Sequence, residues 1–146
     1  MPLHKGHIFL LETAQSACQN LTILLCSQPD DPIPGYTRFE WLNKQFPKAD
    51  VVHDPEPLPR DQGNLMFWDL WMESIQKYCP LQTFDAVFSS EKYGTRLAKE
   101  LNCEHIEVDL DRITFPVSGT DIRNNPKAYQ DYIPDVVRPY YHQYLT

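Results

Sequence analysis

Apolar residues recur along the chain with two alternating spacings. Ile8, Leu11, Ala14 and Cys18 fall on one helical face and predict a helix over residues 7–19. Residues 21–26 form a short, almost wholly apolar run, typical of a strand buried on both faces. Residues 49–53, 84–88 and 105–108 are three further strand candidates. The segments between the strands carry apolar residues at helical spacing: Phe39, Leu42 and Phe46; Trp68, Trp71, Met72 and Ile75; Tyr93, Leu97 and Leu101.

Polar residues and prolines mark the expected ends of these helices. Thr37 and Glu40 have the spacing of a capping box, in which both side chains bind free amides at a helix start. Pro126 is expected to stop a short helix near the C-terminus, and a last helix is expected from about Pro134. Three further residues are candidate N-caps: Asn64, Ser90 and Ser118.

This alternation predicts an α/β fold with a Rossmann-like, doubly wound parallel sheet. The 146 residues suit a single domain, residues 1–146, and the Pro-rich stretch at 55–63 is interpreted as a loop within it. In such a sheet the loop that leads into the first helix follows the central strand. No strand candidate precedes the first helix, so the sequence predicts a sheet that lacks its first strand.

Composition excludes several classes of protein. The chain is 42% hydrophobic, which is too much for a disordered segment. Its 13 Lys+Arg and 20 Asp+Glu give a net charge of −7, so an anionic ligand must be held by a local cluster of positive groups. No apolar run is long enough to span a membrane, and neither a membrane nor a nucleic acid is an expected partner. Four cysteines without a CxxC pair are expected to be free thiols in a cytoplasmic protein: Cys18, Cys26, Cys79 and Cys103.

The first candidate site is the motif His4-Lys5-Gly6-His7, just before the first expected helix. Gly6 lets the main chain come close to a ligand, and a helix start offers free amides and a partial positive charge that favour a phosphate. Two imidazoles and an ammonium add hydrogen-bond donors on the same side. A metal site is less favoured here, because no carboxylate or third histidine stands nearby.

The second candidate site is the stretch at 117–123. Ser118 and Thr120 stand at an expected helix start, and Gly119 allows close approach. Arg123 lies one helical turn beyond Thr120 and can reach back to an anion at the same end. The alternative is an ordinary capped helix with a solvated arginine.

Together the two motifs resemble the signature of the HxGH nucleotidyltransferases. Longer stretches resemble the nicotinamide-nucleotide adenylyltransferases of the NadR type; they cover residues 2–7, 88–94, 108–112, 117–125, 129–134 and 137–139. That family normally has a strand ending in Gly-x-Phe just before the first motif, and this sequence starts without it. The resemblance implies that the phosphate of nicotinamide mononucleotide attacks the α-phosphorus of ATP, giving NAD and pyrophosphate without a protein nucleophile.

The resemblance also assigns roles to residues. It implies that His4, His7 and Arg123 are catalytic, with His7 stabilising charge at the α-phosphoryl group. Mg²⁺ is the implied cofactor, held mainly by the substrate phosphates and water rather than by protein ligands. The implied ATP-binding set consists of both motifs and one more arginine: His4, Lys5, Gly6, His7, Arg112, Ser118, Gly119, Thr120 and Arg123. For Arg112 the alternative is a surface cluster with Asp111.

The nicotinamide end of the substrate needs a flat apolar partner, because a cationic ring stacks well on an indole. Trp68 and Trp71 lie three residues apart and face one side of a helix, and we expect one of them to stack on the ring, with Trp68 favoured. The alternative is that they are core residues. Arg38 and Trp41 match a family pattern or form a packed helix face. Three residues at the end of the third strand candidate complete the expected substrate-binding set: Ser89, Glu91 and Tyr93.

Two other functions stay open at this stage. One is a catalytically weak nucleotide-binding or sensor domain of the same fold. The other is a related adenylyltransferase with a different phosphate acceptor, such as phosphopantetheine or a nicotinate nucleotide. The expected partners are ATP and nicotinamide mononucleotide, and the sequence leaves the oligomeric state open, a homo-oligomer included.

Overall fold

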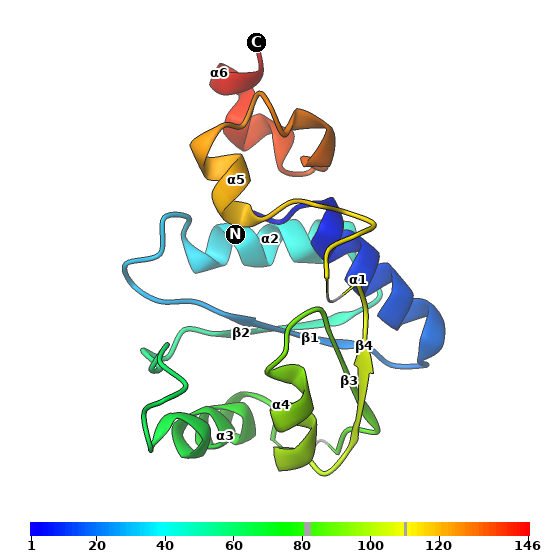
Figure 1. Ribbon diagram of the computed structural model, residues 1–146, viewed down its shortest axis with the longest axis vertical. Helices are drawn as coiled ribbons and strands as arrows, with labels where there is room; N and C mark the ends of the chain where they lie inside the picture. The colour runs from blue at the N-terminus through cyan, green and yellow to red at the C-terminus, as the bar shows by residue number, and fades with distance from the viewer. Residues whose placement is uncertain (81–82, 110) are drawn as a thin grey trace.

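The computed structural model describes residues 1–80, 83–109 and 111–146, so that Leu110, within one stretch of the resemblance, lies outside the described residues. Helices and strands alternate as predicted (Figure 1). The order is α1 (Lys5–Ala17), β1 (Thr22–Cys26), α2 (Gly35–Gln45), β2 (Asp50–Asp54), α3 (Phe67–Tyr78), β3 (Ala86–Ser89), α4 (Gly94–Glu100), β4 (Glu104–Glu107) and α5 (Gly119–Asn124), followed by the 3-10 helices η1 (Gln130–Tyr132) and η2 (Arg138–Tyr141) and by α6 (His142–Leu145).

The strands form two parallel pairs. β1 pairs with β2, and β3 pairs with β4, so the described residues hold two two-stranded sheets rather than one continuous sheet. A cavity of about 1530 Å³ lies between the halves and is lined by residues of both β1 and β3. The alternating elements and parallel strands are consistent with a Rossmann-like nucleotidyltransferase fold.

Helices cover both halves of the strand layer. α2 packs on β1 and β2 from one side, and α3 packs on β2 from the other (Figure 1). α4 packs on β3 and β4, and α1 lies against β3. The expectation of a strand buried on both faces is wrong for β1: Ile23 is buried, but the other residues are only partly buried and the strand lines the cavity. Among the described residues, no helix has both the length and the apolar composition that a bilayer crossing requires.

The main core joins the two ends of the chain. Leu3 is 6% exposed and packs in the same cluster as Ile122 and Val137, which are fully buried. Trp41 and Leu42 of α2 belong to the same cluster. Burial of a side chain of this size stabilises the fold by about 1.5–3 kcal/mol. The segment that carries the first motif is therefore packed against the segment that carries the second.

The helix ends show where the sequence predictions hold. Ser118 is the N-cap of α5 as predicted, and its partner in a capping box is Asp121. The helix ends at Asn124, before Pro126, also as predicted. The continuous helix expected from Pro134 is wrong, since that segment folds into a 3-10 helix and the short α6.

Three other predicted caps are wrong for physical reasons. α2 begins at Gly35, two residues before the expected box at Thr37. Asn64 accepts a hydrogen bond from the Met66 amide and closes the turn before α3 instead of capping the helix. Ser90 donates to the Val108 carbonyl oxygen, a contact between the ends of β3 and β4, and α4 begins only at Gly94. The Ser90 hydroxyl, which the local pattern predicts to cap a helix, is therefore used in a hydrogen bond between distant segments instead.

The Ser118 cap gives a first prediction. Ser118→Ala removes the acceptor for the Asp121 amide, and we expect the free energy of unfolding to fall by about 1 kcal/mol in urea denaturation. Ser16→Ala, on the exposed end of α1, is the matched control and should change it by less than about 0.5 kcal/mol. Equal effects of the two substitutions would contradict the capping role.

Candidate functional site

The first motif forms a pair of stacked imidazoles at the start of α1. His4 is the N-cap, and its Nδ1 accepts a hydrogen bond from the Gly6 amide at 3.1 Å. The His4 amide in turn donates to His7 Nδ1 at 3.2 Å, and the ring centroids lie 3.8 Å apart. Because both Nδ1 atoms accept, a neutral ring carries its proton on Nε2. The helix start therefore fixes two Nε2–H donors.

Both imidazoles are held neutral. Burial, followed by the chain's amino terminus and Arg112, lowers the pKa of His4 to about 4. Burial also lowers the pKa of His7 well below its ordinary value, and His4, the amino terminus, Arg112 and Arg38 act in the same direction. A bound anion would oppose each of these electrostatic effects, so the pair suits a ligand of negative charge.

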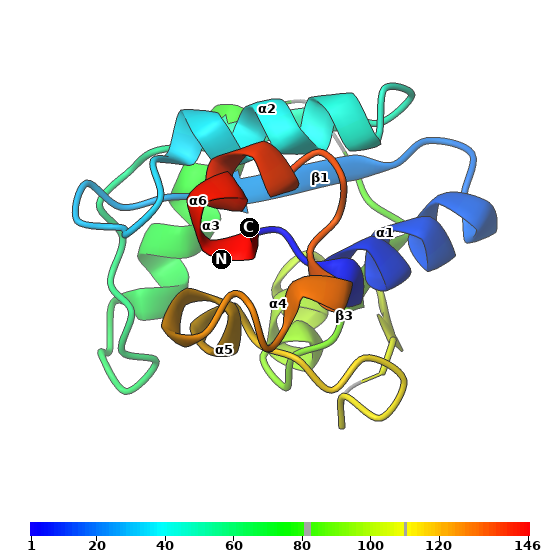
Figure 2. The ribbon, with the colours of Figure 1, turned by 90° about the horizontal axis from the view of Figure 1, so that it is seen from above.

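Arginines and the amino group of Met1 lie near this pair, and in a chain of net charge −7 an anion site needs such a local cluster. The amino group of Met1 has its pKa lowered to about 6 by burial, and next by Arg123 and Arg38. Figure 2 shows the N-terminus between α2, which carries Arg38, and α5, which carries Arg123. Arg112 adopts a φ of 53°, a backbone conformation that residues other than glycine rarely adopt. Such strain is typical of functional sites.

The second motif meets the first through Met1 instead of through the cavity. Arg123 donates from Nη1 to the Met1 carbonyl oxygen and from Nη2 to Thr120 Oγ1. Gly119 is buried under Met1: a Cβ added there would stand 2.1 Å from that carbonyl oxygen. The close approach that Gly119 permits is therefore to the chain itself. The hydroxyl and the amide of Ser118 both donate hydrogen bonds to the Asp121 carboxylate.

The cavity of about 1530 Å³ brings together most of the other expected residues. His4, Gly6 and His7 line it, as do Trp68, Trp71 and residues 89–91. Lys5 is exposed and is not among the lining residues. The residues at the start of α5 do not line the cavity either, because Met1 covers Gly119. The two motifs are adjacent, but their side chains face different spaces.

The two tryptophans have different surroundings. Trp71 donates from Nε1 to the Pro59 carbonyl oxygen at 3.1 Å and packs against Phe67. The Trp68 ring carries the Arg96 guanidinium at 5.4 Å from its centroid. One tryptophan is thus tied to the main chain, and the other already attracts a cation.

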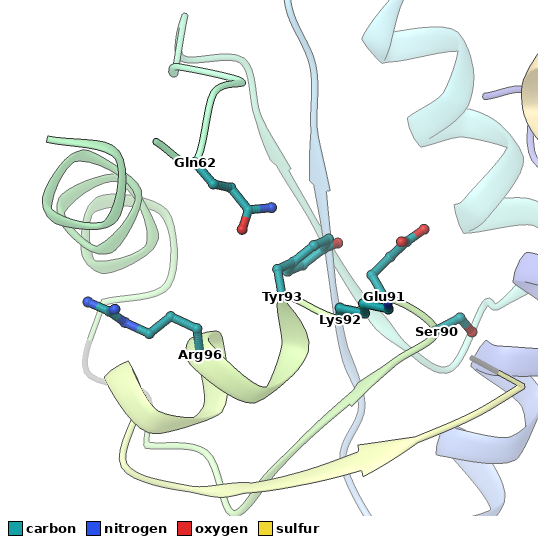
Figure 3. A pocket seen from close by; sticks show the side chains of 6 residues that line it. All are labelled: Gln62, Ser90, Glu91, Lys92, Tyr93 and Arg96. Atoms are coloured by element: carbon teal, nitrogen blue, oxygen red, sulfur yellow. The ribbon is translucent and has the colours of Figure 1, made fainter. Parts of the chain in front are cut away.

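A second cavity, of about 390 Å³, adjoins the start of α4 (Figure 3). Glu91 and Tyr93 line it, and Figure 3 shows Arg96 pointing away from Glu91 toward α3. Glu91 forms an ion pair with Arg112 at 3.2 Å, so Arg112 pairs across the site and not with Asp111 as the alternative supposed. Ser89 is 7% exposed, and its hydroxyl contacts His105 and donates to the Glu91 carbonyl oxygen.

Arg38 is the site residue that sequence reasoning left out of the expected set. It is only 8% exposed, lines the large cavity, and pairs with Asp31 at 2.7 Å. Its Nε–H, buried in the part of the chain that the structure describes, has no hydrogen-bond partner. Trp41, its neighbour in the same pattern, packs in the core. The signal was present in the pattern Arg38-Phe-Glu-Trp41, but the sequence did not separate the lining residue from the packing one.

Metal ligands are scarce around this site. Within residues 1–80, 83–109 and 111–146, no three His, Cys, Asp or Glu side chains are grouped so that they could hold a metal ion. The Asp109 carboxylate accepts three main-chain amides, and Asp121 is engaged with Ser118. These residues fit a metal that arrives with its ligand's phosphates better than one held by protein carboxylates.

Fold and site together define an α/β domain with a large cavity, in which two stacked imidazoles stand near Arg38 and Arg112. No family model matches the chain. It is similar to the trifunctional NAD biosynthesis/regulator protein NadR of Escherichia coli (strain K12), with 29% identity over 166 residues, 96% of this chain and 38% of the relative. NadR of Salmonella typhimurium (strain LT2) is 28% identical over 163 residues, with the same shares. The resemblance to NadR is confirmed over nearly the whole chain, which spans 38% of the length of these relatives.

The lowered histidine pKa gives a prediction for stability against pH. The pKa of His4 is about 4 in the folded chain, below its unfolded value, so the unfolded state takes up the proton first as pH falls through about 6.5. We expect proton uptake by His4 in the unfolded state alone to lower the free energy of unfolding by about 2 kcal/mol between pH 7 and pH 5.

The test compares two substitutions by urea denaturation across this range. His4→Asn keeps an N-cap acceptor while removing the titration, and should flatten the decline. His142→Asn, on the exposed face of α6, should leave the decline as it is. An unchanged slope in His4→Asn would show that the His4 imidazole is not held neutral.

Proposed function

We propose that this domain transfers the adenylyl group of ATP to the phosphate of nicotinamide mononucleotide, giving NAD and pyrophosphate. The proposal is supported by the similarity to NadR, a protein of NAD biosynthesis by its name, over 96% of the chain. The observation that carries it is the stacked pair of neutral imidazoles, whose Nε2–H donors stand near Arg38 and Arg112.

The chemistry needs positioning and charge stabilisation, because the substrates supply both the nucleophile and the leaving group. A phosphate oxygen of the mononucleotide forms a bond to the α-phosphorus of ATP, and the bond from that phosphorus to the bridging oxygen of pyrophosphate breaks. Negative charge on the transferring group is then met by the Nε2–H of His7, with His4 beside it. Arg38 and Arg112 neutralise the remaining phosphate charge.

Arg123 is proposed to hold the outer phosphates of ATP. In the structure its guanidinium is engaged by the Met1 carbonyl oxygen and by Thr120. A triphosphate that reaches both motifs therefore has to replace the Met1 contact. Mg²⁺, held mainly by the substrate phosphates, would neutralise part of their charge; the lack of a metal-holding group of side chains in the described part of the chain fits this arrangement.

Trp68 is proposed to stack on the nicotinamide ring. Its ring lines the large cavity and already holds one cation, Arg96, on a face. The other face would take the positively charged nicotinamide. Trp71 is less suited, since its Nε1–H is bound to Pro59.

A second candidate function is nucleotide binding with weak or no transfer. The position of Met1 favours it, because Met1 lies on Gly119 and engages Arg123. Incubation with ATP, Mg²⁺ and nicotinamide mononucleotide separates the two candidates: NAD formation supports the transferase, and binding without turnover supports the second.

His7→Ala should lower kcat by about 100-fold or more, because one donor to the transferring group is lost. His142→Ala, which removes an exposed imidazole, should leave kcat within about twofold. The rate of NAD formation at saturating substrates is the measurement, with thermal melting to show that both variants fold. A nearly normal rate in His7→Ala would remove its assigned role.

Trp68→Ala should raise KM for nicotinamide mononucleotide about tenfold, as expected from the loss of a cation–π contact of about 1–2 kcal/mol. KM for ATP should change little. Trp71→Phe, which keeps an aromatic ring, is the matched control and should leave both KM values close to normal. An unchanged KM in Trp68→Ala would rule out stacking on this residue.

A further inference from the structure

The two strand pairs carry the same serine–histidine contact. Ser27 Oγ lies 2.7 Å from His53 Nε2, and Ser89 Oγ lies 3.0 Å from His105 Nε2. In both pairs the serine stands two residues beyond the residue that faces the histidine in the neighbouring strand. The partners are 26 residues apart in one pair and 16 in the other. The two halves therefore repeat one local arrangement that sequence spacing hides.

A glycine at a helix start sits directly on each contact. Gly35 is the first residue of α2, and a Cβ there would stand 2.4 Å from Ser27 Oγ and 2.5 Å from His53 Nε2. Gly94 is the first residue of α4, and the corresponding distances to its serine and histidine are 2.1 and 2.3 Å. Neither glycine has a positive φ. Each is therefore required for close approach rather than for backbone conformation.

These contacts are not sites of nucleophilic chemistry. Ser27 and Ser89 are each 7% exposed, and the glycine main chain covers both hydroxyls. The Ser89 hydroxyl donates to the Glu91 carbonyl oxygen, so His105 Nε2–H donates to Ser89, and His105 Nδ1 accepts from Thr95. Each serine–histidine pair is a hydrogen-bonded support that faces a helix start.

The supported helices carry side chains of the candidate site. Arg38 follows Gly35 by three residues, just under one helical turn, and lines the large cavity with its Nε–H unpaired. In the other half, Tyr93 and Arg96 flank Gly94 and line the smaller cavity. A shift of either helix start would move these side chains.

We propose that His53 and His105 are positioning residues: through their serines they fix the starts of α2 and α4, so that Arg38 is held for an anionic ligand, and Tyr93 and Arg96 keep their places in the wall of the smaller cavity. The proposal rests on the proposed function for the identity of that ligand, ATP or nicotinamide mononucleotide. The contact itself is independent of it.

A stability cycle tests the packing. Gly35→Ala should lower the midpoint of urea denaturation, because the methyl group meets the serine and the imidazole. The same change should have a smaller effect in a His53→Ala background, where part of the obstruction is gone. An equal loss in both backgrounds would overturn the packing role of His53. His105→Ala is the matched control background, in which Gly35→Ala should keep its full effect.

A binding cycle tests the positioning. Affinities for ATP and for nicotinamide mononucleotide are measured separately by calorimetry for wild type, His53→Ala, Arg38→Gln and the double variant. We expect His53→Ala to weaken at least one ligand about tenfold, and to change it less than about twofold in the Arg38→Gln background. His105→Ala should keep its effect in that background, since its influence does not pass through Arg38. His53→Gln, which keeps a hydrogen-bonding group, should recover part of the affinity.

The outcomes separate this proposal from the proposed function. Coupling between His53 and Arg38 together with NAD formation by the wild type supports both. Coupling without NAD formation supports the positioning role and overturns adenylyl transfer. Equal loss in both backgrounds, no loss, or a wild type that binds neither nucleotide overturns the positioning role.

Discussion

The structure depends on a contact between residue 1 and a helix 122 positions further along the chain. Arg123 donates to the Met1 carbonyl oxygen, and Gly119 lets the main chain of Met1 lie on the start of α5. The buried Leu3 continues this contact into the main core beside Ile122. Because His4 follows directly, the imidazole pair has its place only when the C-terminal segment is packed. The two motifs are therefore one structural unit, although they begin and nearly end the chain.

The electrostatics of this unit follow from its burial. In a chain of net charge −7, three arginines and the amino terminus are drawn around two neutral imidazoles. Burial, and next repulsion by Arg123 and Arg38, lowers the pKa of the amino group to about 6. A phosphate placed among them would relieve this repulsion and raise the pKa of each imidazole. The free energy that this repulsion costs in the free state is recovered when an anion binds.

Much of this arrangement could be predicted from the sequence, and the exceptions have physical reasons. Short segments rich in apolar and β-branched residues located the strands within about two residues. The Ser118 cap could be predicted because its partner, Asp121, is three residues away. The cap assigned to Ser90 was wrong because its partner, Val108, is distant in sequence. The strands form two separate parallel pairs instead of one sheet. This pairing depends on contacts between distant segments, which no local pattern shows.

The candidate site shows the same division. The histidine motif and Arg123 could be proposed from the sequence because each lies at a helix end with a recognisable local pattern. Arg38 was left between two interpretations, since only its burial beside the cavity distinguishes a ligand contact from helix packing. That Gly119 contacts Met1 could not be read from either residue's neighbours in the sequence. Spacing predicts chemistry within one helix, whereas the meeting of distant segments is decided by packing.

The central claim is that His7 and Arg123, from opposite ends of the chain, act on one triphosphate. Equilibrium binding of ATP, measured by calorimetry without the acceptor nucleotide, tests it through a cycle of His7→Ala, Arg123→Gln and the double variant. The account predicts that the two losses of binding free energy are coupled by at least about 0.5 kcal/mol. Losses that add to within about 0.3 kcal/mol, as for independent sites, would contradict it.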